Sequence, residues 1–98
     1  MRLKSEEINA VKQAALNYFG SDAKVYIFGS RVSDVKKGGD IDIYIETCLR
    51  TDEYIKKKIP FKLELYKKIG EQKIDVVVNN FTDHQYIYEV AKKEGVMI

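Results

Sequence analysis

Three aspartates have the residue type and the spacing to bind a divalent cation. Asp40 and Asp42 are separated by one residue. If this segment is a β-strand, the two side chains project to the same face, about 6.5–7 Å apart along the strand, and can reach one cation. Asp75 stands in the apolar run 74–78, where an acid is costly unless it is paired, hydrogen-bonded or bound to a metal.

A glycine–serine pair has the residue types needed to hold phosphate. Gly29 lets a phosphate approach the backbone closely, while the Ser30 hydroxyl and nearby N–H groups can bind its oxygens. Arg31, Lys36 and Lys37 follow in the same polar segment and could offset phosphate charge. Two magnesium ions in a phosphoryl-transfer site lie about 3.5–4 Å apart and share oxygen ligands, which a third acid such as Asp75 would supply.

Each of these residues also has a simpler explanation when it is taken alone. Asp40 follows two glycines and could be a turn residue, Asp42 could lie on the wet side of a strand, and Asp75 could be an edge-strand acid. Gly29-Ser30 is a common exit from a strand. The remaining polar candidates are most simply solvated or inert: Arg31, Lys36, Lys37, His84 and Cys48.

Three short β-rich runs predict the strands that would position the acids. Residues 24–28 and 74–78 are mostly apolar, and residues 40–46 alternate between apolar and polar. In the alternating run, Ile41, Ile43 and Ile45 predict the face on the core, and Asp40, Asp42, Tyr44 and Glu46 predict the opposite face.

Helical patterns flank these strands. Ser5 can cap a helix with Ile8, Val11, Ala15 and Tyr18 on one face, ended by Gly20. Thr51 can cap a second helix, and Pro60 either ends it or begins a new helix that closes at Gly70. Thr82 and Gln85 have capping-box spacing before a last helix that would bury Ile87, Val90 and Ala91 and end at Gly95.

The order of these elements predicts an α+β fold. A small mixed sheet of about three strands would pack against helices in two layers, and the 98 residues would form a single domain, residues 1–98. A net charge of +2 does not indicate nucleic acid or an anionic membrane as a partner. One cysteine, no signal-peptide pattern and no long apolar run predict a cytoplasmic protein.

In combination, these motifs resemble the nucleotidyltransferase superfamily whose palm is like that of DNA polymerase beta. Within it, the chain looks like the minimal nucleotidyltransferases, the small antitoxin partners of HEPN-domain toxins. The resemblance runs from the opening helix through 28–31, 39–42 and 74–77 to the closing segment 91–95. The Gly-Ser and Asp-x-Asp elements are its specific part.

The resemblance implies roles for individual residues. Gly29 and Ser30, with Arg31 nearby, would bind the nucleoside triphosphate, and Asp40 and Asp42 would bind Mg²⁺. Asp75 would bind metal or act as general base. The implied reaction transfers a nucleoside monophosphate, often AMP from ATP, to an acceptor, and the implied partner is a HEPN ribonuclease toxin.

Two departures and two alternatives accompany this interpretation. Gly39 stands where many relatives have serine, and Pro60 with the run 56–58 matches no family feature. The chain could instead be an antitoxin that acts by binding alone, or a nucleotide sensor without turnover. Because larger relatives use a second domain to complete the cleft, we expect a partner protein or a second copy to do so here.

Overall fold

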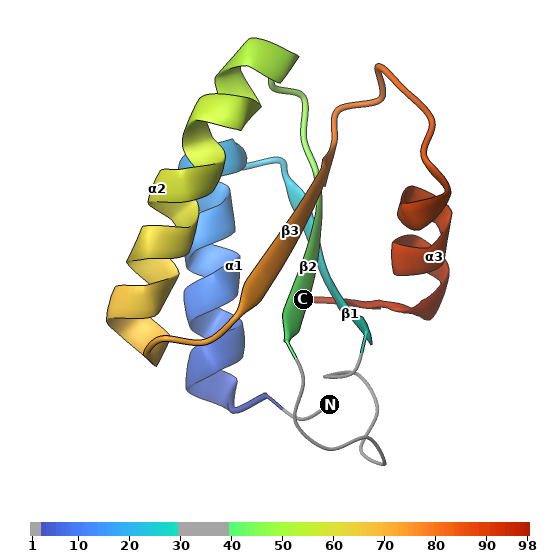
Figure 1. The fold of residues 1–98 in the computed structure, drawn as a ribbon. Coiled ribbons are helices and arrows are strands. Elements are labelled where there is room, and N and C mark those ends of the chain that lie inside the picture. The colour runs from blue at the N-terminus through green and yellow to red at the C-terminus, as the bar shows by residue number, and fades with distance from the viewer. Residues whose placement is uncertain (1–2, 30–39) are drawn as a thin grey trace.

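The computed structural model describes residues 3–29 and 40–98. Its elements are α1 (Ser5–Phe19), β1 (Lys24–Phe28), β2 (Ile41–Glu46), α2 (Thr51–Ile69), β3 (Ile74–Asn79), α3 (Tyr86–Glu94) and β4 (Val96–Met97). The strands form a mixed sheet in the order β3-β2-β1-β4. Helices α1 and α2 cover one face of this sheet and α3 covers the other (Figure 1). The predicted α+β class and element order are confirmed, and β4 adds a strand that the sequence patterns did not indicate.

The pairing of the central strands sets the position of the acids. β1 runs antiparallel to β2, with Phe28 opposite Asp42. β3 runs parallel to β2, with Asp75 opposite Asp42. Parallel strands need a crossover connection, which α2 supplies. The carboxyl end of β1 therefore meets the amino ends of β2 and β3 at one end of the sheet (Figure 1).

The main core lies between the sheet and helices α1 and α2. Ile41, Ile43 and Ile45 are fully buried there, as their alternation predicted. Helix α1 contributes the face expected from its spacing, because Val11 and Ala15 are buried and Ile8 and Tyr18 pack against the core. Within the part of the chain that is described, no helix is long and apolar enough to cross a membrane.

A second, smaller core lies between the sheet and α3, so the expected two layers are three. It contains Tyr26, Phe28, Tyr44, Tyr88 and Ala91. The face of β2 that carries Asp42, Tyr44 and Glu46 is consequently accessible to solvent only near Asp42. The expectation of a strand with one buried face fails at its carboxyl half, because α3 covers it.

The helix ends differ in detail from the sequence predictions. Helix α2 continues through Pro60 as one helix. Both predicted alternatives, a helix that ends at Pro60 and a helix that begins there, are therefore wrong. Lys4 and Arg50 occupy the cap positions that Ser5 and Thr51 were expected to take. The expected glycines do end the three helices.

The last helix corrects two expectations. Gln85 is itself the cap residue of α3, so the predicted capping box that began at Thr82 is wrong. The helix buries Tyr88 and Ala91, whereas Ile87 is exposed. The tyrosine is the better anchor because its ring fills the space over Tyr44, with the ring centroids 6.0 Å apart.

Candidate functional site

The Asp42 carboxylate packs directly against the backbone of Gly29. Because Phe28 is opposite Asp42 in the antiparallel pair, the next residue of the chain passes beside the Asp42 side chain. A Cβ built on Gly29 would overlap Asp42 Oδ2 and lie 3.0 Å from its Cγ. The Gly29 backbone also has a φ of 76°, in the left-handed region that other residues rarely adopt. Glycine at this position therefore gives the carboxylate its space.

Asp42 and Asp75 form a pair across the parallel strands. Directly opposed residues of a parallel pair face the same side of the sheet, so the two carboxyl groups lie close enough for Asp75 to raise the pKa of Asp42 by its charge and by hydrogen bonding. Asp42 is half-buried and Asp75 is exposed. Two residues distant in sequence are thus brought into contact, as the acids of the sequence motif require.

Asp40 makes a different contact. Its Oδ2 lies 3.3 Å from the Lys73 Nζ, in an ion pair at the amino end of β3. In residues 3–29 and 40–98, no three His, Cys, Asp or Glu side chains are grouped closely enough to be a ready-made metal site. The predicted trio is therefore present as a contacting pair, Asp42 and Asp75, with Asp40 held beside it by Lys73.

Asp40, Asp42 and Asp75 crowd negative charge into one part of the sheet, and this affects their neighbours. Burial raises the pKa of Asp42, and the charges of Asp75 and Asp40 and the hydrogen bond with Asp75 raise that pKa further; Lys73 opposes the rise. The hydrogen bond and charge of Asp40, followed by the charges of Asp75 and Asp42, raise the pKa of Lys73. Each effect favours additional positive charge, as a proton or a cation.

This donor set fits a hard divalent cation. Carboxylate oxygens are the ligands that Mg²⁺ prefers, and Mg²⁺ is commonly held by one or two carboxylates together with substrate phosphates. Asp42 and Asp75 would supply those carboxylates, and Asp40 could join them after it leaves Lys73. The predicted phosphate-binding residues Ser30 and Arg31 lie outside the described residues, as do Lys36, Lys37 and Gly39.

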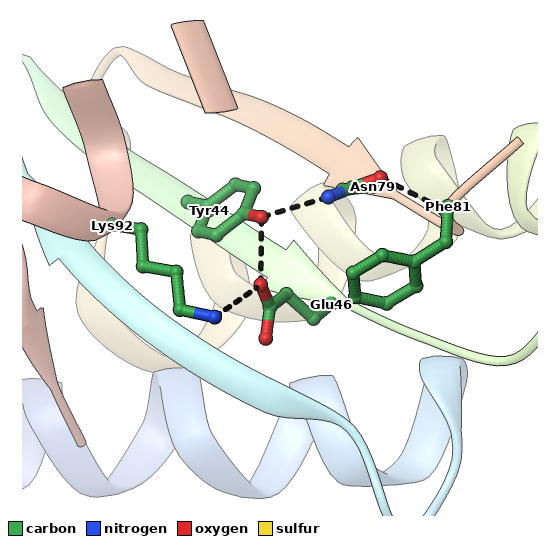
Figure 2. A network of polar contacts seen from close by, with 5 residues as sticks. All are labelled: Tyr44, Glu46, Asn79, Phe81 and Lys92. Atoms are coloured by element: carbon green, nitrogen blue, oxygen red, sulfur yellow. Dashed lines mark hydrogen bonds and ion pairs between the residues drawn. The ribbon is translucent and has the colours of Figure 1, made fainter. Parts of the chain in front are cut away.

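A second polar cluster occupies the other end of the same sheet face (Figure 2). The Tyr44 hydroxyl donates to Glu46 Oε2 at 2.9 Å and accepts from Asn79 Nδ2 at 3.0 Å. Lys92 of α3 reaches the same Glu46 oxygen at 3.3 Å, and the Phe81 N–H donates to Asn79 Oδ1 at 2.8 Å. The cluster ties β2, β3 and α3 together and fixes the loop at Phe81, whose φ is 66°.

A cavity of about 510 Å³ adjoins this cluster, lined by residues that include Glu46, Phe81, Tyr86 and Lys92. Its lining contains none of the three aspartates. The Glu46 side chain is only 6% exposed, but the contacts with Tyr44 and Lys92 satisfy its charge. We therefore assign this cluster to anchoring α3 on the sheet.

Sequence reasoning missed Lys73 and the cluster around Tyr44. A signal for Lys73 exists, because Lys73 and Asp75 are two residues apart at the start of an apolar run, just as Asp40 and Asp42 are. The Tyr44 cluster had a weaker signal, since Tyr44 and Glu46 follow Asp42 at alternate positions. Only the strand pairing and α3 show that these polar side chains are buried.

The sequence of the chain matches a known domain family. No match was found among curated proteins. Residues 8–98 match the family model described as a nucleotidyltransferase domain. The match spans Gly29, the three aspartates, most of α1 and all of α2 and α3, and so the chain belongs to the nucleotidyltransferase domain family.

Proposed function

We propose that the chain is a Mg²⁺-dependent enzyme that transfers a nucleoside monophosphate, AMP from ATP in the first instance, to an acceptor hydroxyl. The observation that carries this proposal is the contact between Asp42 and Asp75 beside Gly29. This contact places two carboxylates against the backbone at the end of β1, next in sequence to the predicted phosphate-binding residues Ser30 and Arg31. The family supports nucleotidyl transfer in general.

The reaction needs little covalent chemistry from the protein. The acceptor oxygen forms a bond to the α-phosphorus, the bond to the bridging oxygen breaks, and pyrophosphate leaves. Mg²⁺, when bound, would neutralise charge on the phosphates and on the leaving group. Asp42 and Asp75, with Asp40, would hold it, and Gly29 with Ser30 would hold the terminal phosphates.

The proton of the acceptor hydroxyl also needs a destination. Asp75 is the exposed member of the carboxylate pair, so an acceptor can reach it. We assign Asp75 either as the base that takes this proton or as a ligand of a second metal ion. Catalysis is then mostly positioning and charge neutralisation.

The experiment that tests this function is transfer of labelled AMP. The chain is purified together with any protein that binds it, supplied with Mg²⁺ and α-labelled ATP, and the products are analysed by intact mass. Asp42→Asn should reduce transfer by about 100-fold or more, because a metal ligand contributes several kcal/mol to the transition state. Asp52→Asn, at an exposed acid on α2, is the matched control. Full transfer by Asp42→Asn would exclude Asp42 from the mechanism.

We further propose that the physiological acceptor and partner is a HEPN-domain toxin. The support is the minimal nucleotidyltransferase resemblance together with an exposed apolar stripe on α2. Ile55, Ile59 and Leu63 recur every fourth residue and are 58%, 70% and 53% exposed. Such a stripe on a helix surface suits a protein partner.

The same stripe supports the alternative that the chain neutralises its partner by binding alone. The two functions separate in a toxicity assay. Asp40→Asn with Asp42→Asn should abolish neutralisation if transfer is needed and leave it intact if occlusion suffices. Ile59→Asp should disrupt co-purification in either case, while Mn²⁺ binding by the isolated chain is unchanged.

A further inference from the structure

Lys73 projects from the same face of the sheet as the three acids. In the parallel register, Ile41 is opposite Ile74 and Asp42 is opposite Asp75. One residue earlier, the Ile41 N–H donates to the Lys73 carbonyl at 3.0 Å, which ties this segment to β2. Since alternate residues share a face, Lys73 stands beside Asp40 as Asp75 stands beside Asp42.

Within residues 3–29 and 40–98, the Lys73 ammonium is the cation that lies beside Asp40, Asp42 and Asp75. Its Nζ lies 3.3 Å from Asp40 Oδ2, and its charge also acts on Asp42 and Asp75. The Lys73 side chain is 72% exposed and the Asp40 side chain is 37% exposed. A pair this exposed contributes little to folding, so the ammonium can leave Asp40 at little cost in stability.

We propose that Lys73 is a built-in counter-cation that occupies Asp40 in the metal-free protein and leaves it when a divalent cation binds. Lys73 is thus a positioning residue that sets the metal affinity of the site. This inference rests on the proposed function, because it takes the three aspartates as the metal ligands. It adds a residue outside the Gly-Ser and Asp-x-Asp elements.

The sign of the effect follows from charge. With lysine present, a divalent cation must displace the ammonium from Asp40 and is repelled by it afterwards. Without lysine, the metal-free acids repel one another more strongly, and the cation gains more on binding. Removal of the Lys73 charge should therefore tighten metal binding about three- to tenfold at low ionic strength.

The test measures Mn²⁺ affinity of the intact chain without nucleotide, by electron paramagnetic resonance of the free ion. Lys73→Met and Lys73→Gln remove the charge and should bind Mn²⁺ more tightly. Lys73→Arg keeps the charge and should bind close to wild type. Lys57→Met, at an exposed lysine near the start of α2, makes the same change in net charge remotely and controls for it.

Two outcomes distinguish failure of this inference from failure of the proposed function. If Asp42→Asn and Asp75→Asn weaken Mn²⁺ binding but Lys73→Met does not tighten it, the counter-cation role is wrong and the site stands. If neither aspartate variant changes Mn²⁺ affinity, the metal site itself is wrong. The increase in Mn²⁺ affinity of Lys73→Met should be smaller at about 500 mM NaCl than at about 20 mM NaCl, because salt screens interactions between charges. Such a decrease would support an electrostatic cause.

Discussion

Gly29 and Asp42 lie so close together that no side chain at position 29 fits beside the Asp42 carboxylate. A Cβ there would overlap Oδ2 and lie 3.3 Å from the Asp42 Cβ. The space available at position 29 and the position of the Asp42 carboxylate therefore depend on each other. A change in one residue displaces the other.

Gly29→Ala should weaken Mn²⁺ binding about tenfold or more and destabilise the fold by about 1–2 kcal/mol. The destabilisation comes from the positive φ, and the loss of binding comes from displacement of the Asp42 carboxylate. Urea unfolding and Mn²⁺ titration measure the two effects separately.

Gly70→Ala is a matched control for this prediction. Gly70 has a φ of 86°, but a Cβ there would meet nothing within 4 Å. It should show the conformational cost without any change in Mn²⁺ affinity. Equal Mn²⁺ affinity in Gly29→Ala and wild type would mean that the Asp42 carboxylate does not need its present position.

Asp42→Asn should raise the Tm of the metal-free chain at pH 7, because it removes a carboxylate charge that burial and the neighbouring acids disfavour in the folded state. The pKa of Asp42 is raised in the folded state, so the folded chain binds this proton more tightly than the unfolded chain. That contribution to stability is fully present below the ordinary value of 3.8 and is lost as pH rises through the raised pKa.

Thermal unfolding at several pH values checks this sign. The difference between Asp42→Asn and wild type should be largest near pH 7 and disappear near pH 3 (roughly one unit below the ordinary Asp pKa). Added Mn²⁺ should raise the Tm of wild type and have much less effect on the variant. A variant that is less stable than wild type at pH 7 without metal would contradict the charge-crowding argument.

Tyr44→Phe should destabilise the fold by about 1–3 kcal/mol, because it leaves Asn79 and Glu46 without their shared hydroxyl in a buried place. Burial and the neighbouring Glu46 raise the pKa of Tyr44 to about 12, even though Asn79 opposes the rise. Alkaline absorbance titration should therefore lose a late-titrating tyrosine in this variant. Tyr86→Phe, at an exposed ring, should leave the free energy of unfolding unchanged.

Pro60→Ala should stabilise the chain by about 1–2 kcal/mol. Proline inside a helix costs about 3 kcal/mol relative to alanine, and its restriction of the unfolded chain returns part of that cost. Pro60 is exposed, so the substitution leaves no cavity. Lys56→Ala on the same helix controls for the helix propensity of alanine in a urea-unfolding series. A less stable Pro60→Ala would mean that the ring makes a contact that α2 requires.

Local patterns predicted the strands and the neighbourhood of the acids well. The alternation around Ile43 is enforced by a fully buried core, so it was visible in the sequence. Asp42 and Asp75 meet because both lie in strands whose apolar residues fix the register. The assignment of these acids, with Ser30 and Arg31, as catalytic and ligand-binding residues stays a prediction.

The misses arose where tertiary contacts override local preference. Helix α2 passes through Pro60 because Phe61 and Leu65, one helical turn apart, are both fully buried and hold the helix against the core. Tyr44 and Glu46 read as a wet face, yet α3 covers them through Tyr88 and Lys92. The sequence pattern predicted the last helix but not the sheet face that it covers. Strand β4, which pairs with β1, has two residues and is too short to show a periodic pattern.

The crossover through α2 has a consequence for the dynamics of the site. The carboxylate pair exists only while β3 is aligned with β2, and that alignment depends on a 19-residue helix packed on the opposite face. Whatever loosens α2 from the core also separates Asp42 from Asp75. A cation that bridges the two carboxylates would in return hold β2 and β3 together. Backbone amide hydrogen exchange would then slow along both strands, and not only at the residues that contact the cation.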